Sequence, residues 1–471
     1  MILWHPRLQG IVLCLAIAIL GPAASAQQGG RIFDIREGRT PRGIRYAFLS
    51  QPFEDRVALS FSWWDGFAQT RPGQELLGRL GVAWLQAGTE RLPEGQFREE
   101  LLDDQIRLDL GTGNRTTGGS VSAPPEKLDL AAERLREVLV TPALSEQALA
   151  RLRRRYASNF AQARETPGTL ARSLLIELLA DQSPFIPEEA GASLRSRGAE
   201  RLGRPEVEAW REAVFDKSSL VVAAAGRSTE EAVVAAIDRA FGELPERTIV
   251  SKPPDTAFRR DGRTIVIERQ VTQTTLVLGA GSTLVWADER DQPLSAIALD
   301  AFASGPTSRL FRAVRDELGA SYGSTAALPM IGGAARYLVI SSAVDPASTA
   351  RALAVIRSEY DRFRRDGLTP MEFETARARF VNGLEEQARR AGPASALLRD
   401  LLRQGRNAAE GPAVLEHLRH RVTREDVNAH VRERWPELPL TTVIVAPSAK
   451  ELVADCVVGR DEQPERCLTS R

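Results

Sequence analysis

The chain has 471 residues, with 62 basic and 62 acidic side chains, four histidines and three cysteines. At roughly 100–200 residues per domain, this length predicts two or three domains. The even charge balance argues against a nucleic-acid-binding protein, which would carry a basic stripe. Four histidines in a chain of this length leave few for any mechanism that needs several histidine side chains in one site.

Residues 1–26 have the pattern of a secretory signal peptide. An apolar core at residues 10–20 is followed by Pro22 and by the small residues Ala-Ser-Ala at 24–26, which form an A-x-A cleavage site. The core is too short to cross the ~30 Å hydrocarbon layer as a helix. We therefore expect cleavage before Gln27, a periplasmic mature chain and no stable membrane insertion. An uncleaved anchor is the alternative.

Two cysteines remain after cleavage, Cys456 and Cys467, close together near the C-terminus. In an oxidising compartment an isolated pair at this spacing is expected to form a disulfide. The bond would staple the C-terminal tail. A catalytic role is not expected, because no histidine lies beside either thiol in the sequence.

The first half of the mature chain is predicted to combine strands and helices. Runs rich in β-branched, aromatic and small apolar residues predict strands, at residues 45–49, 57–63 and 219–225. Apolar residues that recur every three or four positions predict helices, at residues 76–84, 128–139, 144–161, 207–215 and 229–241.

The order of elements then starts again. Residues 245–262 are polar, carry two adjacent prolines and show no periodic pattern, so they predict a linker. Further strands are predicted at residues 264–267, 274–278, 324–328, 336–342 and 441–447. Further helices are predicted across residues 293–318, from 347, from 370, at 394–403 and at 423–435.

Both halves end with a polar cap, a helix and an apolar strand, at a period of about 220 residues. This repeat predicts an α+β protein of two homologous domains, each a mixed, mostly antiparallel sheet packed with helices. The predicted segments are a signal peptide (1–26), an N-terminal domain (27–248), a linker (249–262), a C-terminal domain (263–450) and a tail (451–471).

Three segments carry a resemblance to a known family. They are GVAWLQAGT at residues 81–89, the stretch 202–245, and SRLFRAVRDELGASY at residues 308–322. Over most of residues 35–450 the chain resembles the insulinase/pitrilysin family of metallopeptidases, which includes the mitochondrial processing peptidases. The resemblance implies the two-domain fold of a zinc peptidase that cleaves peptides.

The zinc motif of that family is absent. Family peptidases carry H-x-x-E-H on the helix before Gly-Thr, where two histidines bind zinc and the glutamate activates water. The matching positions here are Arg79, Val82 and Ala83, and the family's distal glutamate ligand aligns with Asn159. Because these side chains cannot hold a hydrated divalent metal, we expect no metal or other cofactor in this chain.

The second-domain motif is intact. Arg315 and Tyr322 match the family's arginine–tyrosine pair, whose donors bind substrate carbonyls and the developing oxyanion. Some family members divide the zinc ligands and this pair between two subunits. The resemblance therefore implies a homologous, zinc-bearing partner subunit, a peptide substrate, and a chamber that admits short or unfolded peptides.

Several alternatives remain open. Arg315 could be a solvated helix residue and Tyr322 a core aromatic, in a catalytically inert scaffold or peptide-binding protein. Residues 319–323 match G-x-S-x-G, but the expected order is helix then strand, the reverse of a nucleophile elbow. His417 and His420 could share a helix face and bind a metal weakly, although neighbouring arginines would repel a cation.

Overall fold

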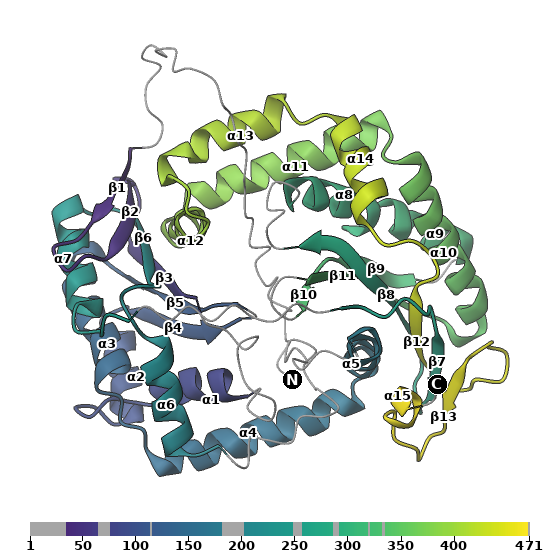
Figure 1. The fold of residues 1–471 in the computed structure, drawn as a ribbon, viewed down its shortest axis with the longest axis horizontal. Coiled ribbons are helices and arrows are strands. Elements are labelled where there is room, and N and C mark those ends of the chain that lie inside the picture. Colours follow the sequence, from purple (N-terminus) through teal and green to yellow (C-terminus); the bar gives the residue numbers. More distant parts are fainter. Residues whose placement is uncertain are drawn as a thin grey trace.

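The computed structural model describes residues 34–64, 76–113, 115–180, 202–247, 257–285, 292–318, 321–331 and 335–469. The predicted signal peptide and residues 249–256 of the predicted linker lie outside the described residues. The chain forms two halves, each with a sheet and its helices (Figure 1). In the part of the chain that the structure describes, no helix is long and apolar enough to cross a membrane.

The first sheet has six strands in the order β1-β2-β6-β3-β5-β4. They are Ile35–Arg39 (β1), Arg45–Ser50 (β2), Val57–Trp63 (β3), Arg107–Thr112 (β4), Thr117–Ala123 (β5) and Val221–Gly226 (β6). Neighbouring strands are antiparallel except β2 and β6, which run parallel. Because successive side chains point to opposite faces, Phe48, Leu59 and Phe61 share one apolar face and its core.

Helices of the first half cover that face of the sheet. They are Leu77–Leu85 (α1), Glu94–Asp103 (α2), Leu128–Val140 (α3), Glu146–Glu165 (α4), Arg204–Val214 (α6) and Glu230–Phe241 (α7). Trp63 and Trp84 are fully buried in this core, where aromatic rings meet edge to face.

The central strands of the second sheet repeat the pairing of the first. Its path is β10-β11-β8-β12-β7-β13, and β9 also pairs with β11. The strands are Thr264–Glu268 (β7), Thr274–Val285 (β8), Ser321–Ala327 (β9), Met330–Ile331 (β10), Ala335–Val344 (β11), Thr441–Ala446 (β12) and Cys456–Val458 (β13). Strands β7 and β12 run parallel as β2 and β6 do, so the predicted α+β class with mostly antiparallel sheets is confirmed.

Helices also cover the outer face of the second sheet. They are Gln292–Ala303 (α8), Arg309–Leu318 (α9), Thr349–Asp366 (α10), Pro370–Ala388 (α11), Gly411–His420 (α13) and Arg424–Arg434 (α14), and a short helix, Arg466–Thr469 (α15), ends the described chain.

The two halves exchange one helix each. Helix α5 (Pro167–Leu179) follows α4 and packs on the inner face of the second sheet, against Ile265, Val277 and Val443. Helix α12 (Ala391–Arg403) follows α11 and packs on the inner face of the first sheet, where the Ser395 and Ser60 hydroxyls are 2.8 Å apart. Figure 1 shows α4 and α11 reaching from one half toward the other. Each sheet is thus covered on both faces only when both halves are folded.

The C-terminal tail seals the edge of the second sheet. Strand β13 runs parallel to β7, and the Sγ atoms of Cys456 and Cys467 form a disulfide whose Cα atoms are 6.0 Å apart. Cys467 is fully buried against the α5 layer. Arg164, at the end of α4, forms an ion pair of 2.5 Å with Glu465 in the tail. The tail therefore helps to hold α5 in place.

Candidate functional site

Helix α1 carries three of the four positions that the sequence predicts to match the zinc ligands and the catalytic glutamate of the peptidases it resembles. Val82 is buried in the first core, and Arg79 and Ala83 are half-buried. A Cβ atom on Gly81 would lie 2.5 Å from the Trp210 ring, so only glycine lets α6 pack this closely on α1. The helix is therefore built to pack against its neighbours.

Helix α4 brings the fourth position alongside. The Tyr156 hydroxyl donates a hydrogen bond of 3.3 Å to the carbonyl oxygen of Arg79, and Asn159 is exposed on the same helix. The structure therefore brings the helices of all four positions together. They do not suit zinc, because an arginine, two hydrocarbon side chains and a neutral amide supply none of the Cys, His or carboxylate ligands that it needs.

A tight turn ends α1 at Gly88 and Thr89. Gly88 has a φ of +104°, and a Cβ atom there would lie 2.8 Å from the backbone nitrogen of Glu94. The Thr89 hydroxyl accepts a hydrogen bond of 3.1 Å from the Leu92 amide. The Gly-Thr pair noticed in the sequence is thus a structural feature, which turns the chain from α1 toward α2.

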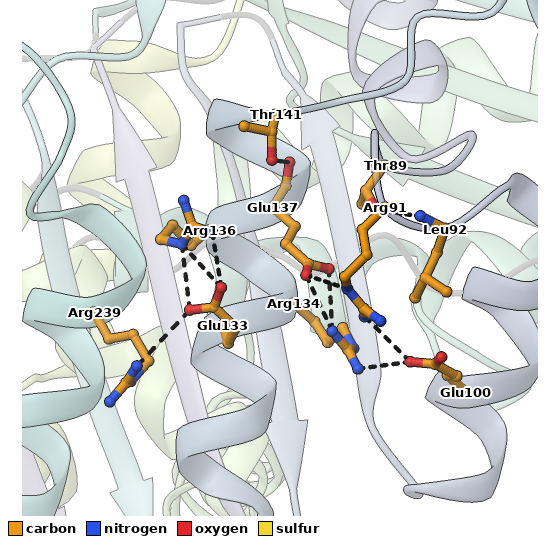
Figure 2. Close-up of polar contacts among 10 residues, drawn as sticks. All are labelled: Thr89, Arg91, Leu92, Glu100, Glu133, Arg134, Arg136, Glu137, Thr141 and Arg239. Atoms are coloured by element: carbon orange, nitrogen blue, oxygen red, sulfur yellow. Dashed lines mark hydrogen bonds and ion pairs between the residues drawn. The ribbon is translucent and has the colours of Figure 1, made fainter.

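Behind this turn lies a closed ring of four alternating charges, shown in Figure 2. Glu137 receives Arg91 Nε at 2.8 Å and Arg134 Nη1 at 3.2 Å. Glu100 receives Arg134 Nη2 at 2.6 Å and Arg91 Nη2 at 3.3 Å. Only 10% of the Arg134 side chain and 6% of the Glu137 side chain are exposed. The ring joins α2, α3 and the turn after α1.

The charge ring was missed from the sequence, although Arg134 and Glu137 are three residues apart on one helix. That spacing puts them within reach of each other, but it is equally common on solvated faces. Their burial requires the opposite charges of Glu100 and Arg91, which lie more than 30 residues earlier in the chain, on α2 and on the turn after α1. Hydrogen bonding to Glu137 raises the pKa of Arg91 above its ordinary value.

The arginine–tyrosine pair lies in the other half of the molecule, on α9 and β9 (Figure 1). Arg315 is exposed, and its guanidinium carbon is 5.8 Å from the centre of the Phe311 ring one turn earlier. Tyr322 occupies a bulge of β9, because Gly323 and Ser321 pair with the consecutive residues Ala343 and Val344. The side chain of Tyr322 lies outside the described part of the structure.

The position of Arg315 leaves its guanidinium accessible. A guanidinium carries five N–H donors in a fixed fork and no acceptor, so it can bind carbonyl or carboxylate oxygens. Bulges are frequent beside functional sites, where they redirect a side chain. Helix α1 lies in the first half of the chain and α9 in the second, so the predicted zinc positions and Arg315 are carried by different halves (Figure 1).

The histidines His420 and His430 make local contacts instead. His420 lies 3.4 Å from Glu416 on α13, whose Arg419 also pairs with that carboxylate. His430 is buried, and its Nε2 lies 2.7 Å from the Ser295 hydroxyl; burial lowers its pKa to about 3. Among the described residues, no three His, Cys, Asp or Glu side chains gather in a way that could hold a metal.

Part of the chain matches a known peptidase family. Residues 201–380, which include Arg315 and Tyr322, match the family described as "Peptidase M16 inactive domain". The predicted resemblance to this peptidase family is confirmed. Two proteins described as uncharacterized zinc proteases, from Rickettsia bellii and Rickettsia felis, are each 21% identical over 280 residues. These matches cover 59% of the chain, which spans 66% of the length of each relative.

Solved structures of M16-like peptidases share the fold. A peptidase M16 inactive domain from Pseudomonas fluorescens superposes with a TM-score of 0.77 at 18% identity, over 88% of this chain and 98% of that one. A protease from Helicobacter pylori superposes with a TM-score of 0.75 at 12% identity, over 88% of this chain and 100% of the protease chain. The periplasmic protease PqqL from Escherichia coli superposes with a TM-score of 0.68 at 15% identity, over 92% of this chain and 49% of the PqqL chain.

Proposed function

We propose that this chain is the non-zinc subunit of a heteromeric, periplasmic M16-like peptidase. The observation that carries the proposal is the contrast between two helices, one in each half of the chain. Helix α1 has Arg79, Val82 and Ala83 where zinc chemistry needs histidine and glutamate, whereas α9 presents an exposed Arg315. Alone, the chain is inactive.

In the proposed assembly, a homologous partner supplies an H-x-x-E-H site to which this chain contributes Arg315 and Tyr322. The Arg315 guanidinium donates hydrogen bonds to a substrate carbonyl, and the Tyr322 hydroxyl donates to the oxyanion that develops during attack. Such donors contribute most in a site from which water is excluded. Zinc, when bound in the partner, polarises the scissile carbonyl and activates water.

The proposed location and substrate rest on separate observations. The N-terminal pattern of a signal peptide, the Cys456–Cys467 disulfide and the likeness to a periplasmic protease support an oxidising, extracytoplasmic compartment. Short or unfolded peptides are the proposed substrates, because two such chains would enclose a chamber that folded proteins do not enter.

The test compares the lone chain with the pair. The chain is purified alone and together with an H-x-x-E-H homologue encoded in a neighbouring reading frame, and each sample is assayed for bound zinc and for hydrolysis of an unstructured peptide. We expect zinc and hydrolysis only in the pair. The matched control pairs this chain with a partner whose motif reads H-x-x-Q-H. Stoichiometric zinc and peptide cleavage by the lone chain would refute the proposal.

A further inference from the structure

The segment that begins α9 carries an arginine that the proposed function does not use. Ser308 is buried, and its hydroxyl donates a hydrogen bond of 2.8 Å to the Gly305 carbonyl. Leu310 is fully buried in the second core. Between them Arg309, the first residue of α9, keeps only 14% of its side chain exposed. This burial of a guanidinium calls for partners.

Arg309 reaches two other helices at once. Its Nε and Nη2 atoms donate to the two carboxylate oxygens of Glu372, on the first turn of α11; the Nε bond measures 3.0 Å. Nη2 also donates at 3.0 Å to the carbonyl of Gly367, which ends α10. The guanidinium carbon lies 5.1 Å from the centre of the Phe363 ring, and Glu359 is 3.7 Å from Nε. A planar, bidentate fork of this kind is specific to arginine.

The surface that receives Arg309 is itself fixed. The backbone nitrogen of Thr369 donates to Glu372 at 2.9 Å and the Glu372 amide donates to the Thr369 hydroxyl at 3.3 Å, which is a capping box. Burial opposes ionisation of Glu372, but the hydrogen bonds from Arg309 and Thr369 outweigh it and lower the pKa. The Leu368 amide donates at 2.8 Å to Asn428 of α14.

Arg315 lies on the helix that begins at Arg309. It lies six residues beyond Arg309 on the same helix, which is about 9 Å at 1.5 Å per residue. A tilt of about 6° about the Arg309 end would move the Arg315 backbone by about 1 Å, and displacements of that size can lower turnover by about a hundredfold. Helix α9 packs against α8, α10 and β9 through Leu310, Val314 and the half-buried Ala313. Apolar packing of this kind has no fixed direction, whereas the hydrogen bonds of Arg309 fix the orientation of the helix start.

We propose that Arg309 is a positioning residue, which clamps the start of α9 to the α10–α11 turn and thereby fixes Arg315 toward the partner's site. This inference rests on the proposed function, because it assigns Arg309 a role through Arg315. Arg309 touches no substrate; it acts by holding the helix.

The experiment uses the active pair and the variant Arg309→Lys, which keeps the charge but loses the fork. We expect kcat to fall by about tenfold to a hundredfold with KM changed less than about threefold. Arg312→Lys is the matched control: it lies on the same helix, its side chain is 55% exposed and its contact to Glu372 is 3.6 Å. It should leave kcat within about twofold.

The decisive readout is the coupling between two substitutions. If Arg309 acts through Arg315, the double variant Arg309→Lys/Arg315→Ala should turn over no more slowly than Arg315→Ala alone. Losses that multiply, or an unchanged kcat in Arg309→Lys, would overturn the inference. Glu372→Gln, which removes the anchor from the other side, should reproduce the loss. If Arg315→Ala alone leaves kcat unchanged, the proposed function fails instead.

Discussion

The buried charge ring behind α1 makes a sharp prediction about stability. In Glu137→Gln, the carboxylate that receives both Arg134 and Arg91 becomes a neutral amide (Figure 2). Arg134 is nearly buried, so its charge would then be balanced by Glu100 alone. Removing one member of a buried ion pair leaves an uncompensated charge in the interior, which typically costs about 3–5 kcal/mol.

We expect the low end of that range, about 3 kcal/mol, because Glu100 keeps its contact with Arg134. The assay is urea unfolding of the purified chain followed by circular dichroism, with the midpoints compared at equal slope. The matched control is Glu133→Gln on the same helix. Glu133 pairs with Arg136 at 2.8 Å, but 29% of its side chain is exposed, so its loss should cost less than about 1 kcal/mol.

Equal costs for Glu137→Gln and Glu133→Gln would refute the reasoning, because the ring would then be no more than a surface ion pair. A double substitution tests whether the cost comes from an unpaired buried charge. Replacing both partners with apolar residues, as in Arg134→Met/Glu137→Leu, should recover part of the loss, since no charge is left without its partner in the interior.

Three further predictions follow. His430 stays neutral in the fold with a pKa of about 3, whereas an unfolded histidine titrates near 6.5; protonation therefore favours the unfolded chain, and stability should fall by about 2 kcal/mol between pH 7.5 and pH 5. Urea midpoints across that range should be flatter in His430→Gln. Leu398→Ala on the exchanged helix α12 should cost about 2–5 kcal/mol, and more than the half-buried Leu397→Ala, in the same urea assay. Val82→Glu should cost on the order of 3 kcal/mol in a thermal melt, because it buries a carboxyl group in the core without gaining zinc.

Much of the fold could be predicted because its elements are strongly patterned. The apolar strands β2, β3, β6 and β12 and the periodic helices α3, α7 and α12 lie close to their expected positions. Strands β4 and β5 were missed, because β5 reads TGGSVSA and lacks β-branched and aromatic density. Its glycines have a packing reason: a Cβ atom on Gly119 would lie 2.0 Å from the Asp109 carbonyl oxygen of β4.

The helix exchange could not be predicted, because periodicity gives the apolar face of a helix but not the sheet that it covers. Helix α5 is buried over most of its surface, which is compatible with either half. The candidate site shows the same limit. Motif spacing predicts positions without zinc ligands on α1 and the pair Arg315 and Tyr322. The contact of Arg309 could not be predicted, because its partner Glu372 lies on a separate helix, 63 residues away along the chain.

The most direct test of the central claim is turnover by the assembled pair when this chain carries Arg315→Ala or Tyr322→Phe. Hydrolysis of an unstructured peptide is measured together with the amount of pair recovered by size-exclusion chromatography. The account predicts that each substitution lowers kcat at least about tenfold, as loss of an oxyanion donor does, while the pair stays assembled and retains zinc. Unchanged kcat in both variants would contradict the account and would assign the chain the role of a scaffold.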